Sequence, residues 1–123
     1  MAQALEKLSL EIYEAASEHA TAHGIILADT KFEFAVEDTE SSSTQTPQLI
    51  LVDEVLTPDS SRFWRASDYA VGRGQKSLDK QYLRDWLTQS ALKGVDGVEV
   101  PAEVVEGTQK AYREAFEMLT GEV

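Results

Sequence analysis

The chain has 123 residues, the size of one small domain. Its 11 Lys and Arg against 22 Asp and Glu give a formal net charge of −11, which repels nucleic-acid backbones and disfavours a nucleic-acid-binding protein. The absence of cysteine excludes disulfide scaffolds, thiolate metal sites and cysteine nucleophiles. No apolar run approaches the ~20 residues of a membrane span, and the N-terminal residues lack a signal-peptide core. We therefore expect a soluble cytoplasmic protein.

The first half of the chain predicts one helix and two or more strands. Apolar residues at helical spacing predict a helix over residues 3–22. The unbroken apolar run from Ile25 to Ala28 is typical of a buried strand. Alternation from Lys31 to Val36 predicts a strand with one apolar and one charged face, and residues 49–52 predict a strand that pairs with it antiparallel. The polar stretch 37–48 between them predicts an exposed hairpin loop.

The second half predicts turns and two helices. Residues 57–62 form turns readily, and residues 65–76 read as a loop. Ser77 is an expected N-cap for a helix that runs to about Leu92, and Pro101 suits the first turn of a last helix. The apolar stripe expected for that last helix is Val104, Thr108, Ala111, Ala115 and Leu119, with Gly121 as its stop. The side chains expected on the buried face of the first of these helices are Tyr82, Leu83, Trp86 and Leu87. The elements predict an α+β fold, an antiparallel sheet with flanking helices. Two strands alone are not stable, so further strands or a missing partner must complete the sheet.

Acidic and basic residues gather where the predicted strands end. Asp29, Lys31 and Glu33 have the period of two that places side chains on one face of a strand. The second strand is followed by more such residues: Asp53, Glu54, Asp59 and Arg62. Carboxylates with Lys and Arg suit Mg²⁺ and a phosphoryl group, although the sequence lacks the glycine-rich phosphate-binding loops. The alternative, which spacing alone favours, is a solvated strand face with cross-strand ion pairs.

Two stretches of the sequence closely resemble the signature motifs of the SAICAR synthetase family. They are GIILADTKFEFA at residues 24–35 and LILVDEVLTPDSSRFW at residues 49–64, and SLDKQYLRDWL at residues 77–87 is also similar to the family. The resemblance covers essentially the whole chain but corresponds to the C-terminal portion of the full-length enzymes. It therefore implies that residues 1–123 form a single domain, the C-terminal lobe of a fold related to kinases and ATP-grasp enzymes, without the N-terminal ATP-binding lobe.

The resemblance implies an ATP-dependent ligase of purine biosynthesis. Enzymes of this family join L-aspartate to carboxyaminoimidazole ribotide and give SAICAR, ADP and phosphate, with activation of the ribotide carboxylate as an acyl phosphate. The implied cofactors are ATP and Mg²⁺, and the implied partners are these substrates and either the missing lobe or a second copy of the chain. We expect no nucleic-acid or membrane partner. The chain alone is expected to be inactive.

The resemblance also assigns roles to ten residues. Asp29 and Lys31 correspond to catalytic residues, with Lys31 on phosphate or on the substrate carboxylate. Glu33 and Asp53 correspond to the residues that handle ATP and Mg²⁺. The residues implied to bind the ribotide and complete its anion pocket are Asp59, Ser60, Ser61, Arg62, Lys80 and Arg84, with Arg62 on the ribotide phosphate.

Other interpretations compete with the ligase. A non-catalytic remnant or interaction module would keep every one of these motifs. A kinase-like phosphotransferase is disfavoured because kinases lack the TPDSSR stretch. His19 and His23 have the spacing of a helical metal pair, but no third ligand accompanies them in the sequence, and histidines at a helix C-terminus are the favoured interpretation. Ala35 stands where the family motif has glycine, and it would strain a turn that required a positive φ.

Overall fold

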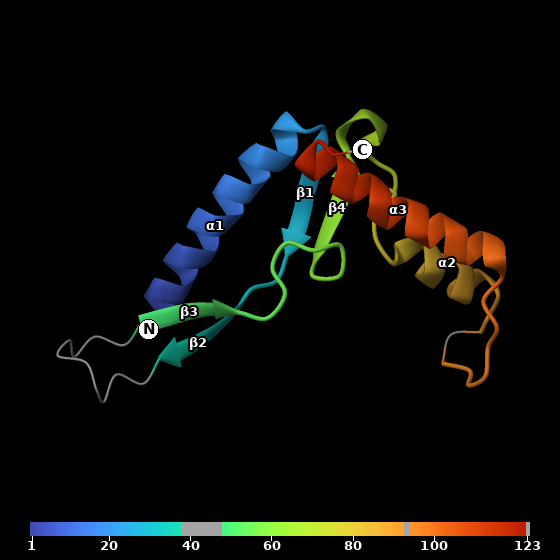
Figure 1. Cartoon of the computed structure of the whole chain (residues 1–123), viewed down its shortest axis with the longest axis horizontal. Helices are drawn as coiled ribbons and strands as arrows, with labels where there is room; N and C mark the ends of the chain where they lie inside the picture. Colours follow the sequence, from blue (N-terminus) through green and yellow to red (C-terminus); the bar gives the residue numbers. More distant parts are fainter. Residues whose placement is uncertain (38–47, 93, 123) are drawn as a thin grey trace.

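A computed structural model describes residues 1–37, 48–92 and 94–122. The helices are α1 (Ala2–Ala22), α2 (Gln81–Gln89), α3 (Ala102–Thr120) and a short 3₁₀ turn, η1 (Ala66–Asp68), and the strands are β1 (Ile25–Thr30), β2 (Glu33–Glu37), β3 (Gln48–Val52) and β4 (Ser61–Arg65). Helices and short antiparallel sheets confirm the α+β class (Figure 1). The hairpin loop expected from the polar stretch lies outside the described residues. None of the described helices is long and apolar enough to cross a membrane.

The strands form two separate antiparallel pairs. The hairpin β2–β3 confirms the predicted pairing, with Glu33 opposite Val52. Ala35 lies inside β2 opposite Ile50, so this position is not a turn and alanine is not strained there. The other pair, β1–β4, contains a strand that the sequence did not predict, because Ser61 to Arg65 continue directly from a turn-forming stretch.

The hydrophobic core lies around β1–β4. The C-terminal ends of α1 and α3 meet beside this strand pair (Figure 1), and His19 Nε2 lies 2.8 Å from the backbone oxygen of Leu119. The His23 ring stacks on His19 and bonds to the His19 carbonyl, so both histidines are engaged with helix ends. The buried apolar residues that form this core are Ala20, Ile25, Leu27, Phe63, Leu78 and Ala115.

Helix α2 begins at Gln81, three residues later than the sequence predicted, and ends at Gln89. Ser77 is not an N-cap, because it forms a bridge with Trp64 and the Leu78 N–H donates to the Phe63 carbonyl at 2.8 Å. The extended segment therefore adds to the edge of β4. Asp79 is buried and accepts a hydrogen bond from the Gln81 N–H at 2.7 Å, which closes a turn just before α2, whose N-cap is Lys80.

Helix α3 agrees better with its sequence pattern. It begins directly after Pro101 and ends at Gly121, whose φ of 73° is the left-handed conformation of a helix stop. Val104 and Ala115 of the expected apolar stripe are buried. By contrast, Tyr82 of α2, expected on a buried face, is half exposed.

Candidate functional site

A groove of about 330 Å³ opens where β1 ends, β4 begins and α2 starts. Eight of the ten residues assigned roles in the sequence line it: Asp29, Lys31, Asp59, Ser60, Ser61, Arg62, Lys80 and Arg84. The sequence brings these residues from three separate stretches, and the fold places them around one cavity. Glu33 and Asp53, the other two, do not line the groove.

The β1–β4 pair forms one wall of the groove. Its register places Asp29 opposite Arg62 and Thr30 opposite Ser61. Arg62 Nη2 lies 2.9 Å from Asp29 Oδ2, and the hydroxyls of Thr30 and Ser61 are 2.7 Å apart. Ser61 is buried, whereas the Arg62 and Asp29 side chains are largely exposed. The strand pairing thus fixes the hydroxyls and leaves the guanidinium accessible to a ligand.

A hydrogen-bonded turn shapes the edge of the groove before β4. The N–H groups of Ser60 and Ser61 donate to the Thr57 carbonyl, at 3.1 and 2.9 Å. The Thr57 N–H donates back to Ser60 Oγ at 3.0 Å, and the Thr57 hydroxyl donates to Glu54 Oε2 at 2.8 Å. The Lys31 N–H donates to the Ser60 carbonyl at 3.2 Å, which ties the turn to the end of β1. The TPDSS stretch therefore has a defined shape before any ligand binds.

Tyr112 of α3 is a site residue that the sequence did not single out. Its hydroxyl donates to Asp59 Oδ1 at 2.6 Å. Burial, together with this hydrogen bond to Asp59, raises the pKa of Tyr112 to about 12, so the hydroxyl stays a donor at neutral pH. Lys80 Nζ lies 3.8 Å from the same Oδ1 atom. Asp59 is therefore held between α3 and the start of α2. The one signal in the sequence was the position of Tyr112 beside Ala111 of the apolar stripe.

Lys31 links the groove to the hairpin. Its Nζ lies 2.6 Å from Glu33 Oε1, and the hydrogen bond to Glu33 raises the pKa of Lys31, with the charges of Asp53 and Glu54 adding to the effect. Asp53 follows β3 directly and has a φ of 65°, which turns the chain there. The expectation that Asp29, Lys31 and Glu33 share one strand face is wrong, because the chain leaves β1 at Thr30 and begins β2 at Glu33.

The carboxylates beside Lys31 fit one kind of magnesium site. Within residues 1–37, 48–92 and 94–122, no group of three or more Asp, Glu or His side chains could enclose a metal. Mg²⁺ bound together with a nucleotide needs only one or two carboxylates, because phosphate oxygens and waters complete its shell. Glu33 lies opposite Val52, the residue before Asp53, and both carboxylates raise the pKa of Lys31. The donor set fits a metal that arrives with phosphates.

The groove is locally cationic in an acidic protein. Four of the 11 basic residues of the chain line it, together with three carboxylates, which gives a net charge of +1. The four cations are Lys31, Arg62, Lys80 and Arg84. Arg84 keeps its place one turn from Lys80, since its N–H donates to the Lys80 carbonyl at 3.0 Å. Such a cluster favours an anionic ligand.

Known proteins with similar sequences and structures agree on one family. A family model described as SAICAR synthetase matches residues 1–101. The chain is 51% identical over 121 residues to the phosphoribosylaminoimidazole-succinocarboxamide synthase of Schizosaccharomyces pombe, an alignment that covers 98% of this chain and 38% of that protein. The chain thus spans 38% of the length of this curated relative and of the Saccharomyces cerevisiae protein of the same name.

Two solved structures extend the comparison. The SAICAR-synthase from Saccharomyces cerevisiae complexed with SAICAR superposes with a TM-score of 0.80 at 50% identity, over 94% of this chain and 36% of that one. A SAICAR synthetase in complex with ADP gives a TM-score of 0.63 at 28% identity, over 98% of this chain and 38% of that one. The family match, the sequence identity and the shared fold together show that the chain belongs to the SAICAR synthetase family.

Proposed function

We propose that the groove is the ribotide-binding part of a ligase site that joins L-aspartate to carboxyaminoimidazole ribotide with ATP. The observation that carries this proposal is the groove itself, which gathers eight residues of the family motifs around one cationic cavity. The solved family member that contains SAICAR supports a ribotide product as the ligand class.

The ribotide would bind in the groove against the wall formed by β4 and the TPDSS turn. Arg62 would bind its phosphate by charge-assisted hydrogen bonds, oriented by the ion pair with Asp29. Ser60, Ser61 and Asp59 would accept and donate hydrogen bonds to the ribose and imidazole groups. Lys80 and Arg84 would complete the anion pocket from the side of α2.

The nucleotide would approach from the hairpin side. A family member is known in complex with ADP. We propose that Glu33 and Asp53 hold Mg²⁺ together with the phosphates, and that Lys31 contacts the transferring phosphoryl group or the ribotide carboxylate. Bound Mg²⁺ would neutralise charge on the phosphates. The Lys31 amine stays protonated beside Glu33, so it can stabilise negative charge on a transferring group.

The proposed reaction has two steps. A ribotide carboxylate oxygen first takes the γ-phosphoryl group of ATP, which forms an acyl phosphate and releases ADP. The aspartate amine then attacks the acyl carbon, the C–O bond to phosphate breaks, and the nitrogen loses a proton as the amide forms. Because the chain spans 38% of its relatives' length, we propose that it is the C-terminal portion of the enzyme. The rest of the family protein would supply most of the ATP pocket.

A binding experiment tests the ribotide site. Titration calorimetry with carboxyaminoimidazole ribotide should show that Arg62→Ala loses about 1.5–3 kcal/mol of binding free energy, the value typical of a charge-assisted hydrogen bond. Arg113→Ala, on the exposed side of α3 and outside the groove, is the matched control and should bind as the unmodified chain does. Unchanged affinity in a folded Arg62→Ala protein would contradict the assignment.

An activity experiment tests whether the chain needs the rest of the family protein for turnover. ADP release with ribotide, aspartate and Mg²⁺–ATP should be absent for the 123-residue chain and should appear when an N-terminal segment of a family member is added. Phosphoryl transfer depends on positioning, and part of an ATP pocket does not position a triphosphate. Ribotide-dependent turnover by the chain alone would refute the proposal that the rest of the family protein supplies most of the ATP pocket. Failure of complementation, with intact ribotide binding, would favour the non-catalytic module.

A further inference from the structure

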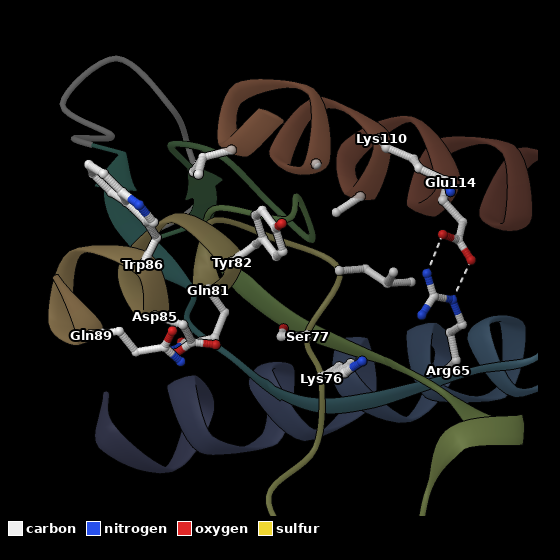
Figure 2. A pocket seen from close by; sticks show the side chains of 14 residues that line it. Arg65, Lys76, Ser77, Gln81, Tyr82, Asp85, Trp86, Gln89, Lys110 and Glu114 are labelled. Carbon is white, nitrogen blue, oxygen red and sulfur yellow. Dashed lines mark hydrogen bonds and ion pairs between the residues drawn. The ribbon is translucent and has the colours of Figure 1, made fainter. Parts of the chain in front are cut away.

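A second and larger cavity, of about 560 Å³, lies between α2 and α3. None of the ten residues assigned roles in the sequence lines it, and Gln81 is its point of contact with the groove because it lines both. Figure 2 shows α3 above the cavity and α2 at its lower left, with the segment before α2 running down beside them. The ligase proposal leaves this cavity without a role.

One end of the cavity is aromatic and apolar. Trp86 and Tyr82 of α2 line it together with the buried Val104 of α3. The Tyr82 ring packs on Gly107, where an added Cβ would lie 2.5 Å from the ring. Glycine inside a helix costs about 1 kcal/mol relative to alanine, and this close approach is the structural reason for it. The result is a wall of two rings, of which Tyr82 is half exposed and Trp86 is partly buried.

The opposite end of the cavity is cationic. Lys76, Lys110 and Arg65 lie there, at the far side of Tyr82 from Trp86 (Figure 2). Both carboxylate oxygens of Glu114 accept hydrogen bonds from Arg65, so that guanidinium is already engaged. No ion pair joins Lys76 or Lys110 to a carboxylate within the described part of the chain. The charge of Lys110 helps to lower the pKa of Glu114, so this amine lies near that carboxylate, but no ion pair holds either amine and both can bind an anion.

Helix geometry gives the spacing between the two ends. With a rise of 1.5 Å per residue, Trp86 lies about 6 Å along α2 from Tyr82, and Lys110 lies about 5 Å along α3 from Gly107, in the opposite direction. Since Tyr82 packs on Gly107, the aromatic and cationic ends are separated by about 10 Å along the cavity. This length suits a ring system joined to an anionic group by a short linker.

Ser77 places an unsatisfied polar group beside the cavity. The residue lines the cavity, and its hydroxyl oxygen, which is closed off from solvent, has no hydrogen-bond partner among the described residues. A buried hydroxyl without a partner is costly, and in folded proteins nearly every such group is satisfied by protein, water or ligand. The amide of Gln81, the Asp85 carboxylate bonded to it and Gln89 add further polar groups at the aromatic end.

We propose that the cavity between α2 and α3 is a binding site for a small planar heteroaromatic molecule that carries an anionic group. The rings of Tyr82 and Trp86 stack on the planar group, and Lys76 and Lys110 bind the anion. This site is separate from the proposed ribotide groove and does not depend on it.

Adenosine 5′-monophosphate is a suitable probe, because it combines both features in one small molecule. Tryptophan fluorescence and titration calorimetry on the 123-residue chain should show binding in the pocket, with quenching that Trp86→Phe removes. Lys76→Ala/Lys110→Ala should weaken binding of the monophosphate at least tenfold and leave binding of adenosine, which lacks the anion, unchanged. Lys7→Ala, an exposed lysine of α1, is the matched control and should have no effect.

Two results would overturn the assignment of this site. Binding that is lost in Arg62→Ala and retained in Lys76→Ala/Lys110→Ala would place the probe in the groove and overturn the proposal. Absence of any binding by the folded chain at millimolar monophosphate would also overturn it, and neither result would touch the ribotide site.

Discussion

The two strand pairs are both antiparallel but differ in how deeply they are buried. β1 and β4 bury four residues, Ile25, Leu27, Ser61 and Phe63, whereas the described residues of β2 and β3 bury none. The buried pair carries the wall of the ribotide groove. The exposed hairpin carries Glu33 and leads into Asp53, the residues proposed for Mg²⁺–ATP.

This difference indicates that packing in the core holds the ribotide wall in place, whereas the hairpin that carries the residues proposed for Mg²⁺–ATP lacks such packing. A two-stranded hairpin is marginally stable by itself, and Val36 and Ile50 on the hairpin are 53% and 43% exposed. The ribotide wall should therefore hold its shape in the isolated chain, while the hairpin adds little to stability. The following predictions test that contrast.

The largest effect is expected in β4. Phe63→Ala removes a fully buried ring from the core and should lower the free energy of unfolding by about 3–5 kcal/mol. Phe34→Ala, in the half-buried position of β2, should cost about 1 kcal/mol. Urea unfolding monitored by circular dichroism measures both. Phe63→Leu, a milder change, keeps the comparison measurable if the alanine variant fails to fold. Equal losses of unfolding free energy at the two positions would contradict the difference in packing between the two strand pairs.

The ion pair between β4 and α3 should have the next largest effect on the free energy of unfolding. Glu114→Gln breaks the paired hydrogen bonds to Arg65 and should cost about 1–3 kcal/mol near neutral pH. The Arg65 guanidinium lowers the pKa of Glu114 in the folded protein. The stabilisation is therefore complete above the ordinary carboxyl pKa, and it is lost as the pH falls through the lowered folded value.

Unfolding measured across acidic pH checks this expectation. The difference between the unmodified chain and Glu114→Gln should shrink at low pH, because both side chains are then neutral. Glu106→Gln, an exposed carboxylate of the same helix, is the control and should give a small, nearly constant difference. A Glu114→Gln penalty that stayed constant down to strong acid would show that the ion pair is not its source.

A smaller effect is expected from Tyr112. Tyr112→Phe removes the hydrogen bond that holds Asp59, which should cost about 0.5–1.5 kcal/mol of unfolding free energy and weaken ribotide binding by up to about tenfold. Tyr69→Phe, a half-exposed ring outside the groove, serves as the control. Calorimetry that gives identical ribotide affinity for Tyr112→Phe and the unmodified chain would show that Asp59 needs no support from α3.

The smallest effect is expected on the exposed face of the hairpin. Ile50→Thr should change stability by no more than about 0.5 kcal/mol, as at most surface positions. Leu27→Thr makes a comparable exchange of an apolar side chain for a hydroxyl in the buried β1, and it should cost several times more. A large loss from Ile50→Thr in thermal unfolding would mean that the hairpin face is packed in solution, and the two strand pairs would then be equivalent.

Local patterns predicted much of the fold, and their success has a physical basis. Alternation over residues 31–36 predicted β2 because its apolar and charged faces differ. The apolar stripe of α3 and the flanking Pro101 and Gly121 predicted that helix almost to the residue. The groove residues were predicted as a set from the family motifs, and eight of them do meet.

Three features depend on contacts distant in sequence, and local patterns did not predict them. β4 exists because residues 61–65 pair with β1, more than 30 positions earlier. The late start of α2 follows from the bonds between residues 77–78 and that same strand. Tyr112 reaches Asp59 across 53 positions, and its position beside the apolar stripe of α3 does not by itself mark it as part of a site.

The cationic groove also has a kinetic consequence. At distances beyond the Debye length, about 10 Å at 0.1 M salt, an approaching anion is repelled by a chain of net charge −11 and meets the local excess of +1 only at close range. Added salt at low ionic strength should therefore screen the repulsion first and speed the encounter of a phosphorylated ligand with the groove. Basic binding surfaces behave in the opposite way, since salt weakens the attraction that draws anions to them. The direction of this salt effect in a stopped-flow measurement distinguishes recognition by a few placed cations from capture by overall charge.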